Sequence, residues 1–335
     1  MISCTEFIPL YSEFFKYLER RGGHDAVMAY WIHISDTFIG DITNPNSLAY
    51  KCERLGGFEG AIAYWGHTLT EEACDLFEME DRKENVKYSH MRYCPSRGML
   101  NSLSHVEPYY DYCSHCNVIY GRILKKYGVI YERDNSDIAN ASCRECFYEK
   151  SNPPKFDFRK MSDDDFRKRA SEDGITIIDM KSEDNKYLHR DFHTALDNAL
   201  RYCGDFFGHG EVVSFLCDYV KYFYAPLIAD IKSKGLTALS SFIENTYKKE
   251  EASSLLHIDL QENTLTVTVN KCPAIEYMHS LGQEPSQYFI ETTRTLYAKL
   301  ANECGYSFSL EYYNEDGGAR FIFKSKKQLK QGVRK

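Results

Sequence analysis

The sequence contains no apolar run close to the roughly 20 residues that a membrane-spanning helix needs. It has no basic block longer than KSKK near the C-terminal end, and its formal net charge is −8, so no footprint of nucleic-acid binding is visible. The first residues carry Glu6 and Glu13 where a secretion signal has a basic segment. We therefore expect a soluble, cytoplasmic protein that binds neither membranes nor nucleic acid.

Cysteine is the abundant reactive residue, with 12 copies in 335 residues. In a reducing compartment these thiols stay reduced, and C-x-x-C spacing then favours metal or redox chemistry over disulfides. Cys113-x-x-Cys116 and Cys143-x-x-Cys146 have this spacing. A chain of this length is also long enough for two domains, each with its own core.

The sequence contains what looks like an internal duplication. The stretch GFEGAIAYWGHTLTEEA from Gly57 resembles GLTALSSFIENTYKKEEA from Gly235, and further matches follow in the same order. These matches are Cys94-Pro95 with Cys272-Pro273, Tyr127-Gly128 with Cys304-Gly305, and RECFYEK with ARFIFK. The second copy lacks the paired cysteines, so we expect the reactive site in the first copy.

Each copy shows a helical period first and a strand period afterwards. Leu265, Val267 and Val269 alternate with polar residues, which is typical of a half-buried strand, and the following Cys-Pro step ends that strand. We therefore predict an α+β fold of two tandem repeats, each a helical layer followed by a small antiparallel sheet with one helix inserted after the Cys-Pro turn. The predicted segments are a first repeat over 1–150, a linker over 151–184 with a short helix after Ser162, a second repeat over 185–327 and a basic tail over 328–335.

The quartet Cys113, Cys116, Cys143 and Cys146 is the strongest chemical signal. Two C-x-x-C pairs can complete a tetrahedron around Zn²⁺, and we expect the first pair at the start of a helix and the second at the start of the last strand. A closed four-cysteine zinc site is normally structural, so catalysis requires one position to open, for which Cys94, Asp111 and His115 are nearby in sequence. The alternatives are four buried thiols that serve as small apolar residues, or a redox pair.

Histidines supply the remaining candidates. His67 lies one helical turn before Glu71, which suits a general base, although Thr68-x-x-Glu71 also fits a capping box. His189, His193 and Asp197 follow one another at helical spacing and offer a second possible metal site, or simply a solvated helix face. His24 and His209 open the first helix of each copy in similar contexts, which favours a packing or capping role.

The segment 257–324, with NKCPAIEYMHSLGQEP, LANECGYSFSLEY and GGARFIF, resembles the L-2-amino-thiazoline-4-carboxylic acid hydrolase family. The first copy is similar, with RYCPSRGML, YCSHC, KKYGVIYE and CRECF. This resemblance implies a hydrolase that opens a small cyclic C–N bond. Arg320 stands in the alignment where the first copy has Cys146, which puts any activity of the second copy in doubt.

Two functional interpretations follow. The first is a zinc-dependent hydrolase with His67 and Cys94 as catalytic residues and with Arg97, Trp65 and Tyr110 as residues that bind the small-molecule substrate. The second is a non-catalytic sensor of small molecules or metals that resembles the 4-vinyl reductase type of domain and carries a structural zinc. An open metal position beside a cleft favours the enzyme, whereas a saturated metal site remote from any pocket favours the sensor.

Overall fold

The computed structural model describes residues 1–171 and 174–326, and of His67 only the backbone. The chain divides into two compact units, here called the first unit (Ile8–Asp191) and the second unit (Met1–Phe7 together with the residues from Phe192 onward). Each unit combines helices with one antiparallel sheet, so the predicted α+β class is confirmed. The segment Met1–Phe7 belongs to the second unit, which corrects the expectation that the first repeat begins at residue 1.

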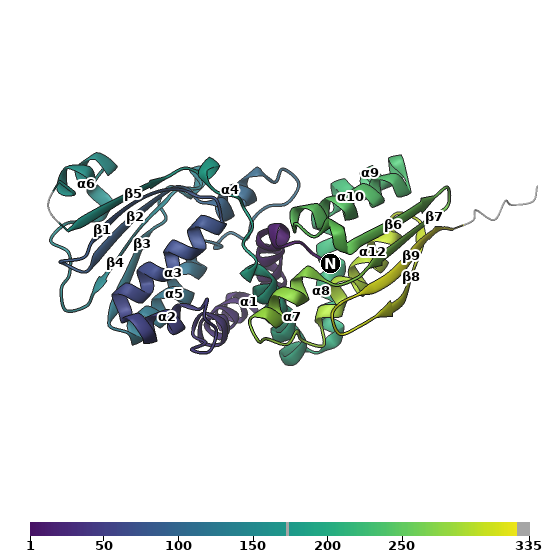
Figure 1. Cartoon of the computed structure of the whole chain (residues 1–335), viewed down its shortest axis with the longest axis horizontal. Coiled ribbons are helices and arrows are strands. Elements are labelled where there is room, and N and C mark those ends of the chain that lie inside the picture. Colours follow the sequence, from purple (N-terminus) through teal and green to yellow (C-terminus); the bar gives the residue numbers. More distant parts are fainter. Residues whose placement is uncertain (172–173, 327–335) are drawn as a thin grey trace, which may run out of the picture. The chain divides into compact units, whose positions relative to one another are not determined.

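Helices cover one face of the first unit's sheet, and a shorter helix lies on the other face (Figure 1). The strand order is β3-β4-β2-β1-β5. Its helices are α1 (Phe7–Ile34), α2 (Leu48–Leu55), α3 (Gly57–Glu71), α4 (Pro95–Ser102), α5 (Ser114–Lys126) and α6 (Asp163–Arg169). Its strands are β1 (Asp75–Asp81), β2 (Val86–Tyr93), β3 (Val129–Asp134), β4 (Cys143–Glu149) and β5 (Ile175–Met180).

The second unit has the sheet order β6-β7-β9-β8. Its helices are α7 (Asp191–Phe207), α8 (His209–Phe223), α9 (Ala225–Lys234), α10 (Leu236–Lys249), α11 (Pro273–Ser280) and α12 (Arg294–Glu303). Its strands are β6 (Leu256–Gln261), β7 (Thr264–Val269), β8 (Tyr306–Tyr313) and β9 (Ala319–Ser325). It also contains the 3₁₀ segments η1 (Cys4–Glu6), η6 (Ser253–Leu255) and η7 (Phe289–Thr292).

The two units share one connectivity. Reading β6, β7, β8 and β9 as counterparts of β1, β2, β3 and β4 turns the second sheet order into the first without its edge strand β5. Cys94 and Cys272 each precede a helix that begins with proline, α4 and α11. Gly128 and Gly305 end α5 and α12 with φ angles of 76° and 82°, a left-handed conformation that glycine adopts without strain. The fold is compatible with the duplication, whose common ancestry stays a prediction.

The segment predicted as a linker is part of the first unit. β5 pairs with β1 along its whole length, and α6 carries Phe166 into the apolar cluster on that face of the sheet. The short helix after Ser162 is confirmed, with Ser162 and Asp165 forming a capping box. Sheet packing therefore orders these residues despite their polar composition.

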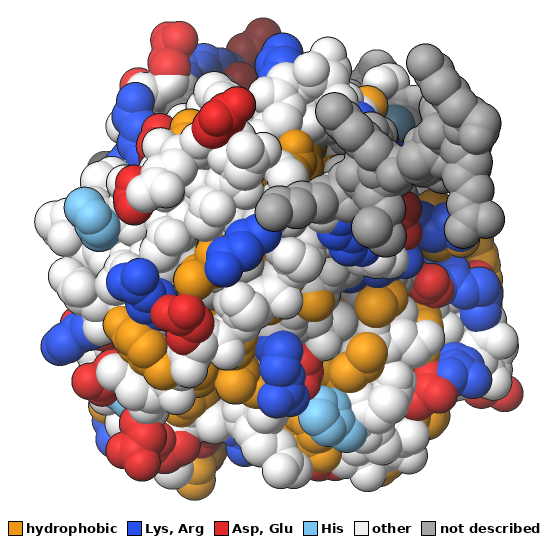
Figure 2. All heavy atoms as spheres, turned by 90° about the vertical axis from the view of Figure 1, so that its right-hand side faces the viewer, with side chains coloured by type: hydrophobic (Ala, Val, Ile, Leu, Met, Phe, Trp, Pro, Cys, Tyr) orange, Lys and Arg blue, Asp and Glu red, His pale blue; other side chains and the backbone are white. Residues whose placement is uncertain are grey.

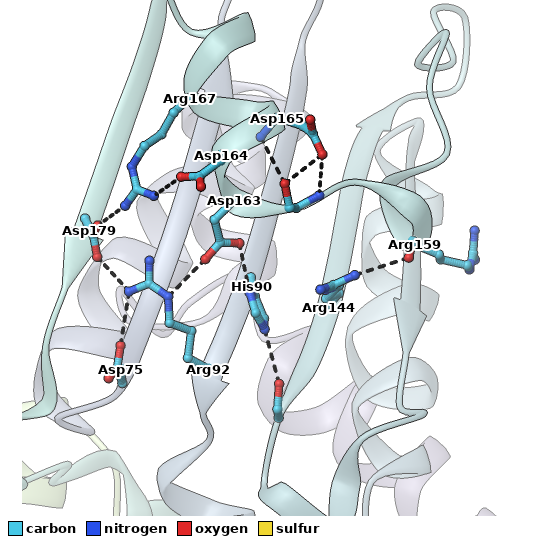
Figure 3. A network of polar contacts seen from close by, with 12 residues as sticks. Asp75, His90, Arg92, Arg144, Arg159, Asp163, Asp164, Asp165, Arg167 and Asp179 are labelled. Atoms are coloured by element: carbon cyan, nitrogen blue, oxygen red, sulfur yellow. Dashed lines mark hydrogen bonds and ion pairs between the residues drawn. The ribbon is translucent and has the colours of Figure 1, made fainter.

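A polar network fastens α6 and β5 to the sheet (Figure 3). Arg92 on β2 donates to Asp163 of α6 at 3.0 Å, to Asp179 of β5 at 2.7 Å and to Asp75 of β1 at 3.3 Å. His90 lies 2.9 Å from Asp163, with its other ring nitrogen 3.2 Å from Ser142 Oγ. One guanidinium group on β2 thus joins α6, β5 and β1.

The surface in Figure 2 shows acidic and basic side chains interspersed, with small apolar patches between them and no broad field of one sign on that face. No helix in the described ranges is by itself long and apolar enough to cross a membrane. Among the described helices, one pair, His209–Phe223 and Ala225–Lys234, is long and apolar enough when taken together, and it is bent by 68°.

Candidate functional site

Four cysteines of the first unit gather around Arg133, namely Cys94, Cys113, Cys116 and Cys143. We call these residues, together with Arg97 and His115, the cysteine–arginine cluster. Cys113 is the N-cap residue of α5, Cys116 lies in the first turn of that helix, and Cys143 begins β4. The sequence predicted both placements, the first cysteine pair at the start of a helix and Cys143 at the start of a strand. Cys94 contributes from the N-cap of α4, where its sulfur accepts from the backbone N–H of Arg97 at 3.4 Å.

Arg133 lies among these thiols. Its Nη2 donates to Cys143 Sγ at 3.0 Å, and it also hydrogen-bonds Cys116. Cys116 Sγ is in addition 3.6 Å from His115 Nε2. Side chains alternate along β3, so Tyr131 and Arg133, two residues apart, point to the same face of the sheet. This alternation in VIYERD was the available signal for Arg133, which the sequence interpretation missed.

Cys146 does not belong to the cluster. Residues three apart in a strand point to opposite faces, so Cys143 and Cys146 of β4 are separated by the sheet itself. Cys146 is fully buried in the apolar cluster of Phe77, Met79, Val86, Tyr88, Phe158 and Phe166. The four-cysteine zinc site is therefore not assembled, because one of its four sulfurs lies on the wrong side.

The charge of Arg133 is a second argument against a metal ion there. A guanidinium group stays protonated, and at 3.0 Å from Cys143 it stands where a cation would have to bind. Within the described part of the chain, the one group of three or more His, Cys, Asp or Glu side chains with ligand atoms within 4.8 Å of one another lies in the second unit and consists of Cys4, His193 and Glu250.

Electrostatics single out one thiol of the cluster. Burial by itself raises the pKa of Cys116, but the charges and hydrogen bonds of Arg133 and His115 outweigh it and lower this pKa from 9.0 to about 7. Burial raises the pKa of Cys143 to about 11, and it also raises the pKa values of Cys94 and Cys113. At neutral pH the cluster therefore holds a substantial fraction of one thiolate, on Cys116, among neutral thiols.

The two arginines have unused donors. Nε and Nη1 of Arg97 and Nε of Arg133 are buried and have no hydrogen-bond partner among the described residues. A buried donor without a partner costs about 1–3 kcal/mol, so such groups are usually satisfied by something. Because these groups lie near Cys94 and Cys116, the cluster is a place that can donate hydrogen bonds to a guest with acceptor atoms.

The equivalent place in the second unit lacks the arginine and contains Met1. Strand register pairs Arg133 with Glu145 in the first unit and Leu310 with Phe321 at the matching step of the second. Thr293 precedes Gly305 by as many residues as Cys116 precedes Gly128, so Thr293 is the counterpart of Cys116. There the nitrogen of Met1 lies 3.4 Å from Thr293 Oγ1 and 3.4 Å from Tyr297 Oη, and the Cys272 thiol is 3.4 Å from Met1 Sδ.

Register also corrects one detail of the alignment. Met91 of β2 pairs with Cys143, and its counterpart Val269 of β7 pairs with Ala319. Cys143 therefore corresponds to Ala319 and Cys146 to Ile322, rather than Cys146 to Arg320.

The other predicted residues have separate settings. Trp65 is buried in an aromatic group with Tyr64, Tyr120, Tyr131 and Phe147 that borders the cluster. Tyr110 is 66% exposed and donates to Glu19, so it contacts solvent rather than the cluster. The side chain of His67 lies outside the described residues. An open hollow of about 560 Å³ beside the end of α4 is lined by Leu100 and residues 103–108 and contains none of the cysteines.

The remaining histidines are paired with protein groups. His189 bonds Glu71 at 2.6 Å, His193 bonds Glu250 at 2.9 Å, and Asp197 accepts from the backbone of Ser286 at 2.9 Å. These three residues consequently turn to different partners and form no common metal site. His24 is 3.1 Å from Tyr109 Oη and His209 is 2.7 Å from Glu291 Oε1.

Comparisons with protein-family models, with curated proteins and with solved structures found no match for this chain. The resemblance to the thiazoline-carboxylate hydrolases and that to the 4-vinyl reductase type both stay predictions, and function has to be argued from the side chains.

Proposed function

We propose that the first unit binds a small molecule carrying an anionic group, with Arg97 and Arg133 as the anion-binding residues. This proposal is supported above all by the buried guanidinium nitrogens of Arg97 and Arg133, which have no hydrogen-bond partner among the described residues. Carboxylate and phosphate oxygens are the acceptors that arginine suits best, because its planar fork donates two parallel hydrogen bonds. This is the ligand-binding alternative among the two interpretations, without the structural zinc.

The second unit supports the proposal as an internal control. At the matching register it carries Leu310 and Phe321 in place of Arg133 and Glu145, and the side chain of Met1 occupies the region beside Cys272. A guest of about the size of a methionine side chain thus fits this position of the fold. In the first unit the same position has the guanidinium donors of Arg97 and Arg133.

A cysteine-dependent hydrolase is the second candidate. It is favoured by Cys116, whose pKa of about 7 and contact with His115 suit a thiolate nucleophile beside a proton donor. In this form the enzyme needs no zinc, and Arg133 stabilises the thiolate. Cyclic amides and amidines are the substrate class to test first, because the family resemblance points to them.

The test compares the wild-type chain with Arg133→Leu, which installs the residue that the second unit has. We expect at least one of acetate, benzoate and inorganic phosphate to raise the melting temperature of the wild type and to leave that of the variant unchanged. Equal shifts in both proteins, or no shift with any probe, would contradict anion binding at this cluster. Turnover of a cyclic amidine that disappears in Cys116→Ala would favour the hydrolase over simple binding.

A further inference from the structure

A second group of reactive side chains lies in the second unit, away from the cysteine–arginine cluster. Cys4 comes from the 3₁₀ turn η1, His193 from α7, and Glu250 caps the C-terminal end of α10. One ligand atom from each lies within 4.8 Å of the other two, and the three residues are 1%, 1% and 3% exposed. Thiolate, imidazole and carboxylate are the three protein ligands that zinc uses.

The histidine is oriented as metal-binding histidines are. His193 Nε2 lies 2.9 Å from Glu250 Oε2, so in the neutral imidazole this nitrogen carries the proton and donates it to the carboxylate. Nδ1 then holds a lone pair. It is buried and has no partner among the described residues. A carboxylate behind an imidazole, fixing its tautomer and raising its basicity, is the usual outer partner of a metal-bound histidine.

The carboxylate is held in place by the N-terminal segment. Glu250 Oε1 accepts from the backbone N–H of Cys4 at 2.6 Å and from Ser3 Oγ at 2.6 Å. These bonds hold Oε1, so the orientation of the Glu250 carboxylate is fixed with Oε2 directed at His193. They also fix Cys4 next to the histidine, so the donors are positioned before any ion arrives.

We propose that Cys4 and His193, with Glu250 as third ligand or as the partner that orients His193, bind a divalent ion of the zinc type. Thiolate and carboxylate together supply two negative charges, which a dication balances inside the protein. With Glu250 as third ligand one tetrahedral position remains for a water molecule, and with Glu250 as the orienting partner two positions remain. Such an ion would tie the segment Met1–Phe7 to α7 and α10, and the site is independent of the anion-binding function proposed for the first unit.

Cobalt substitution in the full chain tests the proposal. We expect one equivalent of Co²⁺ to bind with a thiolate-to-cobalt charge-transfer band, to be displaced by Zn²⁺, and to bind at least tenfold more weakly in Cys4→Ser and His193→Gln. Cys217→Ser on α8 is the matched control in the same unit and should bind Co²⁺ like the wild type. Cys113→Ser, in the first unit, should do the same.

Two results would overturn the proposal. The first is a wild-type chain that shows no thiolate–cobalt band and no rise in melting temperature with Zn²⁺, a measurement that needs no variant to fold. The second is a band that persists in Cys4→Ser and disappears in Cys113→Ser, which would place the ion in the first unit.

Discussion

At the scale of single residues, the charge of Arg133 decides the chemistry of its surroundings. It lies beside Cys143 and Cys116 and helps to lower the pKa of the half-buried Cys116 thiol, which burial by itself would raise. Removing this charge should change both the reactivity of Cys116 and the affinity for anions. Both changes are measurable separately.

The pH dependence of alkylation reports the thiolate directly. We expect the iodoacetamide reaction of Cys116, followed by peptide mass spectrometry, to reach half its maximal rate near pH 7, since its pKa is about 7. Cys143, with a pKa of about 11, should react only at much higher pH. Because the folded-state pKa is lowered, the thiolate stabilises the fold fully above the ordinary thiol pKa, and this contribution declines as the pH falls through 7.

In Arg133→Leu, the pH at which Cys116 is alkylated at half its maximal rate should rise by at least about one unit, because a neighbouring opposite charge is lost. Arg122→Leu is the control. Arg122 lies on the same helix as Cys116 but pairs with Asp36 at the surface, so its loss should leave the profile in place. An unchanged profile in Arg133→Leu would show that Arg133 does not hold the thiolate.

At the scale of elements, β4 divides the predicted zinc quartet. Cys143 lies on the face of the sheet that α3 and α5 cover, whereas Cys146 packs on the other face in the apolar cluster with Phe166 of α6. Cys146→Ser should cost about 1–3 kcal/mol of unfolding free energy, because it buries a hydroxyl in an apolar setting, and should leave Cys116 reactivity unchanged. Urea unfolding and the alkylation profile check the two parts. A variant with altered Cys116 reactivity would join the two faces functionally and contradict the division.

Local patterns in the sequence predicted the elements well. The Cys-Pro helix starts, the helix-ending glycines and the capped helix after Ser162 are all short-range features, and each is present. The predicted strand RECFYEK already implies that Cys143 and Cys146 point apart, but the C-x-x-C spacing was weighed above this alternation. Cys4 and Glu250 are 246 positions apart, so no spacing rule could have joined them.

At the scale of the whole chain, the two units carry one connectivity and opposite contents. Sheet order, helix starts and helix ends correspond in the two units. At one register position, however, the first unit has Arg133 paired with Glu145 and the second unit has Leu310 paired with Phe321. The contrast explains why the cysteine–arginine cluster, and with it the proposed anion site, is expected in the first unit alone.

An experimental structure should therefore superpose residues 55–150 on 233–325, with Cys94 on Cys272 and Gly128 on Gly305. Placement of either pair in unrelated elements would contradict the shared fold and remove the internal control.

Crystals grown in sodium bromide test directly whether the cysteine–arginine cluster binds an anion. Bromide scatters anomalously and needs only donors to bind, so it marks the site whatever the natural ligand is. The account predicts an anomalous peak within hydrogen-bond distance of the Arg97 and Arg133 nitrogens and no peak beside Leu310 and Phe321. A map without a peak at the cluster, in which those nitrogens instead donate to acceptors of the protein itself, would contradict it.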